Sequence, residues 1–280
     1  MRKAAPFLAG PTGSAARHVA VTGGSPRQTP PFPFGDVLGR TFDTAFSRPV
    51  LGSRLLAQTL LMALAYALLT AAVGRFFDFT ASAIYLTLSG VPYTFIFAPM
   101  AVSLHRLVLL GEPLPASLLS VPRAKDYALL GLMLYIPLLV LQYFAQVSIN
   151  AGDKGLVLAL SLSLFVASVL AMRLFVALPY FALDEPHPVL TAWRHTAGHW
   201  WQVTGLTLVL GAATLAAVIF LGAALVLLLN LIVGENPLVL AFALQLFLVA
   251  VMTFVVVLTV AMLTQIVLAV DPRAPRPPSG

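Results

Sequence analysis

The chain has 280 residues, of which 60% are hydrophobic and only 9% charged, and its mean hydropathy is +0.95. Soluble domains are about 45–50% apolar and about 25% charged, so this chain has too few ionisable side chains to cover a water-soluble fold. The composition excludes a soluble globular enzyme and a disordered chain, and the absence of cysteine excludes disulfides and thiolate metal sites. The meaning of the net charge of +6 depends on where the Lys and Arg residues lie along the chain.

Residues 1–34 are rich in Pro, Gly, Ser and Arg and end in the sequence TPPFPFG. No apolar run long enough for a signal peptide follows the basic start, so we predict a disordered cytoplasmic tail over residues 1–34. The next segment, DVLGRTFDTAFS, places apolar residues at helical spacing with polar residues between them. This pattern predicts an amphipathic helix near residues 36–48 that lies on the membrane surface and ends before Pro49.

Six longer apolar segments follow this helix. A helix needs about 20 apolar residues to cross the hydrocarbon of a bilayer. The segments that meet this length are residues 55–73, 90–110, 127–149, 156–178, 204–229 and 238–270. For residues 76–90 the sequence allows two interpretations, a short interfacial segment or an extension of the second span. The sequence therefore predicts an all-α, polytopic domain over residues 35–270, with six transmembrane helices and two interfacial amphipathic helices, and a cytoplasmic tail over residues 271–280.

The basic residues are distributed unevenly between the two sides that this topology creates. With the N-terminus in the cytoplasm, fourteen of the sixteen Lys and Arg residues fall on the cytoplasmic side, and only Arg75 and Lys154 fall opposite. Cytoplasmic loops carry an excess of basic residues, so both termini are predicted to be cytoplasmic. Scarce lysine beside abundant Ala, Leu and Pro favours a GC-rich bacterial genome and hence the cell inner membrane. The positive charge then reflects an anionic inner leaflet, and we expect no nucleic-acid partner.

All three tryptophans lie in the segment PVLTAWRHTAGHWWQVTG, after the fourth span. At helical spacing, Trp193 and Trp200 share a face, and His195 and His199 lie on nearly the opposite side. This pattern predicts a second interfacial helix near residues 188–201. Trp193, Trp200 and Trp201 would anchor it at the level of the lipid headgroups, with the imidazoles toward water.

The sequence contains no recognisable catalytic pattern. His195 and His199 have the spacing of half a helical zinc site, but the segment lacks the glutamate of the HExxH motif. Nothing in the sequence positions a third ligand, so a solvated helix face is the preferred interpretation and no metal is predicted. Nucleophile-elbow and phosphate-loop patterns are also absent. We therefore expect no catalytic site and no cofactor.

Arg106 and Arg173 lie deeper in apolar sequence than the other basic residues. If the fourth span continues to Leu183, Arg173 lies near the midplane, where a charge costs at least about 2.5–3.5 kcal/mol and has to face a partner or a wet cavity. The preferred alternative ends the span near Arg173, whose side chain then snorkels. The two arginines are candidates for one basic pocket that binds an anionic lipid or ligand. They are equally suited to binding backbone carbonyls and to pairing with Glu112 or Asp184.

Several segments resemble a widespread bacterial inner-membrane family. The segment RLFVALPY that starts at Arg173, the turn Asp184-Glu185-Pro186 and the helix PVLTAWRHTAGHWWQVTGL are similar to its Arg–apolar–Leu–Pro segment, acidic turn and Ala-rich amphipathic helix. DVLGRTFDTAFSRP resembles the opening helix of the family, and HRLVLLGEPLP resembles stand-alone proteins of alphaproteobacterial type. The family includes the membrane portion of some glycerophosphodiester phosphodiesterases. The resemblance covers residues 35–270 and implies a six-span membrane fold, without the phosphodiesterase activity because that catalytic domain is absent.

We expect an integral inner-membrane protein without a catalytic site that binds a lipid of the anionic inner leaflet or a membrane partner. A protein partner and a homo-oligomer both remain open. The alternative function is a small transporter, a permease or a subunit of one, which needs broken helices around a polar cavity. Pro92 and Pro99 supply a break in the second span, but the sixth span has no matching proline.

Overall fold

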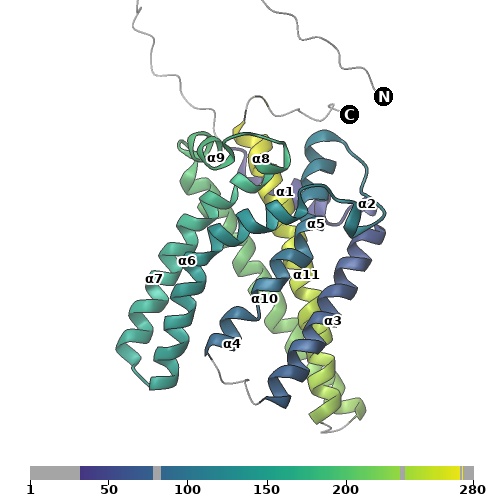
Figure 1. Ribbon diagram of the computed structural model, residues 1–280, viewed down its shortest axis with the longest axis vertical. Coiled ribbons are helices and arrows are strands. Elements are labelled where there is room, and N and C mark those ends of the chain that lie inside the picture. Colours follow the sequence, from purple (N-terminus) through teal and green to yellow (C-terminus); the bar gives the residue numbers. More distant parts are fainter. Residues whose placement is uncertain (1–31, 78–82, 234–236, 272, 274–280) are drawn as a thin grey trace, which may run out of the picture. The chain divides into compact units, whose positions relative to one another are not determined.

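The computed structural model describes residues 32–77, 83–233, 237–271 and 273, so most of the two predicted tails lies outside the described residues. Within the described residues the fold is all-α, without a β-strand (Figure 1). The helices are α1 (Phe34–Ala45), α2 (Arg48–Leu51), α3 (Arg54–Phe76), α4 (Ala83–Leu88), α5 (Val91–Leu110), η1 (Leu118–Ser120), α6 (Ala124–Ala151), α7 (Lys154–Phe175), α8 (Ala177–Ala182), α9 (Pro188–Thr196), α10 (Trp200–Val233) and α11 (Pro237–Val270).

Six helices of the described chain are long and apolar enough to cross a membrane, which confirms the predicted number of spans. They are α3, α5, α6, α7 with α8, α10 and α11. The short helices α1, α2, α8 and α9 lie toward one end of the bundle, here called the α8–α9 end (Figure 1). The turn between α6 and α7 lies at the opposite end.

Pro179 divides the predicted fourth span into two helices. Helix α7 ends at Phe175, four residues before Pro179. A proline cannot donate to the carbonyl four residues earlier, and its ring clashes with that carbonyl. Helix α8 begins at Ala177 and has Pro179 in its first turn, where backbone N–H groups lack helical partners in any case. Arg173 therefore lies in the last turn of α7.

The segment between the first two spans, for which the sequence allowed two interpretations, contains a separate short helix. Helix α4 ends at Leu88, and Gly90 precedes the first residue of α5. The hydroxyl of Tyr66 on α3 donates to the Ser89 carbonyl oxygen at 2.9 Å, which fixes the turn between the two helices. The segment is thus distinct from the second span, and residues 78–82 lie outside the described part of the chain.

The first amphipathic helix packs against α11. Helix α1 buries Val37, Thr41 and Ala45, which recur every four residues and so share one face. On the facing side, the Gln265 side-chain amide of α11 donates to the hydroxyl of Thr44 at 3.1 Å. Protein therefore covers Val37, Thr41 and Ala45 at the α8–α9 end, whereas Phe42 and Phe46 remain 37% and 50% exposed.

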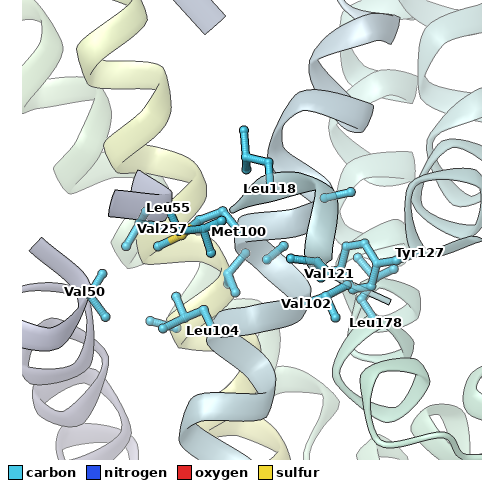
Figure 2. Close-up of a cluster of buried hydrophobic side chains, with 14 of the residues drawn as sticks. Val50, Leu55, Met100, Val102, Leu104, Leu118, Val121, Tyr127, Leu178 and Val257 are labelled. Carbon is cyan, nitrogen blue, oxygen red and sulfur yellow. The ribbon is translucent and has the colours of Figure 1, made fainter. Parts of the chain in front are cut away.

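Two clusters of buried side chains hold this end together. The first joins α3, α5, α6 and α11 and includes Leu55, Leu104 and Val257 (Figure 2). The second joins α1, α8, α9 and α10 to the end of α11 and includes Leu206 and Ile266, both 0% exposed. The core therefore concentrates where the short helices meet the spans.

Helices α7 and α10 lose buried contacts with distance from the α8–α9 end, whereas α3, α5 and α11 stay packed together in a third buried cluster that includes Ala67, Phe97 and Val249. In the described part of α10, the buried residues are Val203, Thr204, Leu206 and Leu210, all in its first three turns. The buried residue of α7 is Ala171, close to the same end. Figure 1 shows the far halves of α6 and α7 apart from α3 and α11. The exposed faces of these helices are apolar, as contact with lipid requires.

Candidate functional site

Arg173 lies between the last turn of α7 and the end of α9. Its Nε donates to the Thr196 hydroxyl at 3.0 Å, and its Nη2 donates to the Trp193 carbonyl oxygen at 2.9 Å. The Cζ atom of Arg173 lies 3.7 Å from the centre of the Trp193 ring, within the range of a cation–π interaction. Carbonyl groups at a helix C-terminus carry partial negative charge, so the end of α9 orients the guanidinium.

The charge of Arg173 has no carboxylate beside it among the described residues. The ion pairs of this part of the chain involve Arg106, Arg123 and His195, and none includes Arg173. Its two hydrogen bonds go to neutral oxygens and use two of the five guanidinium N–H groups. Arg173 is thus a partly buried cation that is held in position and can still bind an anion.

Arg106, on α5, has a different environment. Its Nε and Nη2 donate to the two carboxylate oxygens of Glu112 at 2.7 and 2.8 Å, a bidentate pair. Its Nη1 donates to the Ala182 carbonyl oxygen at 3.1 Å and lies 3.7 Å from the Asp184 carboxylate. The structure therefore shows the alternative in which Arg106 binds a carbonyl and pairs with acidic residues, and its charge is neutralised.

The acidic partners of Arg106 belong to a larger network outside the spans. The Arg106 guanidinium lowers the pKa of the Glu112 carboxyl, because its hydrogen bond favours the charged form. Asp184 also pairs with Arg123 at the start of α6. Asp184 and Arg123 have φ angles of 64° and 60°, which residues with a side chain adopt rarely. The network ties the segment between α5 and α6 to the turn after α8.

Arg106 and Arg173, the two predicted pocket residues, share no contact partner among the described residues. Arg106 contacts Glu112 and the end of α8, and Arg173 contacts α9. A pocket shared by both arginines stays a prediction. Arg173 is the member of the pair whose charge no described carboxylate neutralises.

The sequence interpretation missed a buried polar relay at His105, the residue before Arg106. His105 is 0% exposed; its Nδ1 lies 2.7 Å from the Thr264 hydroxyl and its Nε2 lies 3.0 Å from the Tyr127 hydroxyl. The Thr264 hydroxyl donates its one proton to the Val260 carbonyl oxygen, so it accepts from Nδ1, and Nε2 accepts from Tyr127. The relay joins α5, α6 and α11 without a net charge. The only signal in the sequence was a histidine near the end of an apolar span.

The imidazole of His195 is directed toward Tyr180 and Asp271 and its side chain is only 22% exposed, so the prediction that it points toward water is wrong. Its Nδ1 lies 2.7 Å from the Tyr180 hydroxyl and 3.3 Å from an Asp271 carboxylate oxygen. Tyr180 is 2% exposed and the Asp271 side chain is 10% exposed. Helix α9 packs against α8 at the point where α11 ends, so protein covers the face opposite Trp193. The periodicity of α9 indicates two faces but does not indicate what covers each of them.

The three tryptophans are divided between two helices. Helix α9 ends at Thr196, two residues before the helix-weakening Gly198, and Trp200 and Trp201 belong to the first turn of α10. Trp193 is 44% exposed and Trp201 is 67% exposed, so both rings are available to lipid headgroups. The Trp200 and Trp201 rings stack with their centres 3.6 Å apart. Their role as interfacial anchors stays a prediction.

No protein-family model, curated protein or solved structure matches the chain. The resemblance to the six-span bacterial family therefore stays a prediction. Over the described residues, no group of three or more His, Asp or Glu side chains could hold a metal ion. The chemistry of the site has to be inferred from the contacts around Arg173.

Proposed function

We propose that this chain is an integral protein of the bacterial inner membrane that binds the phosphate group of an anionic lipid at Arg173. The observation that carries the proposal is the guanidinium of Arg173. It is held by Thr196 and Trp193 at the end of a span, with no described carboxylate within ion-pair distance. The six apolar helices support the membrane location.

A lipid phosphate is the anion that fits this position best. The anionic headgroups of a bilayer lie at the ends of transmembrane helices, where Arg173 lies on α7. A guanidinium presents paired N–H groups that match phosphate oxygens, and it is less strongly hydrated than an ammonium group. The exposed ring of Trp193 beneath the guanidinium suits the same interfacial layer.

Native mass spectrometry of protein from mixed micelles tests the proposal, with phosphatidylglycerol and phosphatidylethanolamine as competing lipids. We expect Arg173→Gln to weaken retention of phosphatidylglycerol at least about tenfold, because a charged hydrogen bond contributes about 1.5–3 kcal/mol. Retention of phosphatidylethanolamine should weaken less, because the ammonium group of that lipid partly neutralises its phosphate. Arg194→Gln is the matched control, because Arg194 is an exposed arginine of the same helix as Trp193. Equal retention by the wild type and Arg173→Gln would contradict the proposal.

We also propose that the α8–α9 end faces the cytoplasm. Of the basic residues in the described chain, Arg75 and Lys154 lie at the opposite end, and Arg106, Arg123, Arg173 and Arg194 are among those at the α8–α9 end. The chain has no cysteine, so single substitutions can be labelled without background. In intact spheroplasts, a membrane-impermeant maleimide should label Lys154→Cys and should not label Arg194→Cys. The reverse pattern would contradict this orientation.

A further inference from the structure

A groove runs along α10 and α11, beginning at Met172 near the end of α7. It has a volume of about 360 Å³, and its end nearest the α8–α9 end is formed by Met172, Thr207 and Met262. From there it extends between the two helices to Val218 of α10 and Leu248 of α11. Its walls are almost wholly apolar. The groove therefore lies at the depth of lipid acyl chains, and Arg173 is the residue after Met172.

The dimensions of the groove distinguish between an acyl chain and a helix as its occupant. The wall residues of α11 extend from Leu248 to Met262, which is about 21 Å at 1.5 Å per residue. The volume of about 360 Å³ extends along that length, so the groove is narrow. An α-helix with side chains is about 10–12 Å in diameter and is far too wide for it. A single hydrocarbon chain fits, because carbon atoms pack about 3.5–4.0 Å apart.

We infer that one acyl chain of an anionic phospholipid lies in this groove, with its phosphate at Arg173. The inference rests on the proposed function for the headgroup, and the shape of the groove supports the chain independently. About 15 Å of hydrocarbon belongs to each leaflet, so a chain that starts below Arg173 can remain within the groove over its depth. The lipid thereby fills the space between the parts of α10 and α11 that line the groove.

Gly211 allows the groove to be filled by substitution. Gly211 lines the groove, and a Cβ atom built on it meets no other heavy atom within 4 Å. A side chain added at Gly211 would therefore start in open space at the groove, and Gly211→Leu would place its bulk there. Ala216 is exposed on the same helix, about 140° around its axis from Gly211, and is not part of the groove. Ala216→Leu is the matched control, because it adds similar bulk to another face.

Photocrosslinking with two synthetic probes tests the inference on the full-length protein in nanodiscs. Each probe carries a diazirine midway along one acyl chain, on either a phosphatidylglycerol or a phosphatidylethanolamine headgroup. In the wild type, we expect crosslinks with the phosphatidylglycerol probe to map to residues 207–218 and 248–262. We expect Gly211→Leu to lose these crosslinks, and Gly211→Ala and Ala216→Leu to keep them.

The pattern of crosslinks separates failure of the groove from failure of the headgroup site. Crosslinks scattered over all exposed faces of α10, unchanged in Gly211→Leu, would overturn the groove assignment. Crosslinks confined to the groove but equally strong with both probes, and unaffected by Arg173→Gln, would support the acyl-chain site and overturn headgroup binding at Arg173. The wild-type map decides the location of the chain even if Gly211→Leu does not fold.

Discussion

The two ends of the helical bundle are organised in opposite ways. At the α8–α9 end, short helices, two clusters of buried side chains and ion pairs hold the spans together. Toward the other end, α7 and α10 bury none of their described residues, and the groove opens along α10 and α11. In a bilayer, contact between helices is not required to remove apolar surface from water, so polar contacts near the interface can determine the arrangement.

The same contrast separates the two arginines. Arg106 is neutralised by Glu112 and Asp184 and ties the segment after α5 to the turn after α8. Arg173 is oriented by neutral groups of α9 and borders the divergent part of the bundle. Similar positions in apolar sequence therefore give one arginine that stabilises the fold and one that remains able to bind an anion.

The largest expected effect comes from truncating a side chain at the packed end. Leu206→Ala should lower the free energy of unfolding by about 2–5 kcal/mol, because it leaves a cavity at a position that is 0% exposed. Leu221→Ala, on the same helix at a 58% exposed position, should change it by less than about 0.5 kcal/mol. Reversible unfolding in mixed micelles measures both. Equal losses would contradict the difference in packing between the two ends.

An intermediate effect is expected from the ion pair of Arg106. Arg106→Ala should destabilise the protein by about 1.5–3 kcal/mol, because it removes bonds to charged and carbonyl oxygens of a partly buried network. A double-mutant cycle with Glu112→Ala should give a coupling free energy of about 0.5–3 kcal/mol. Arg173→Ala should cost less stability than Arg106→Ala, because its bonds go to neutral acceptors. If the losses in free energy of unfolding of Arg106→Ala and Glu112→Ala simply added up in the double mutant, the ion pair would not contribute to stability.

The smallest effect is the pH dependence of the same pair. Arg106 lowers the pKa of Glu112 in the folded state, so the pair stabilises the protein fully above the ordinary carboxyl pKa of 4.5. This stabilisation is lost as the pH falls through the lowered pKa, where the folded carboxyl becomes protonated. The difference in melting temperature between the wild type and Glu112→Gln should therefore narrow between pH 6 and about pH 3. A constant difference over this range would contradict the role of the Glu112 charge.

The spans could be predicted from the sequence because length and hydropathy are local properties, as the limits of α6 and α11 illustrate. The break at Pro179 was harder to predict, since prolines are common inside membrane helices and α5 continues through Pro99. The partners of Arg106 and Arg173 depend on where the α8–α9 segment docks, which no local pattern indicates. For the same reason, the inward direction of His195 follows from contacts with α8 and α11 that are distant in sequence.

A cryo-electron microscopy structure in nanodiscs that contain phosphatidylglycerol is the most direct test of the central claim. We predict headgroup density with phosphate oxygens about 2.7–2.9 Å from the guanidinium nitrogens of Arg173, and an acyl chain that continues along α10 beside Gly211. Arg106 should remain paired with Glu112 in the same map. A carboxylate of the protein bound to Arg173 in place of lipid, or a phosphate bound at Arg106 with Arg173 free, would contradict the account.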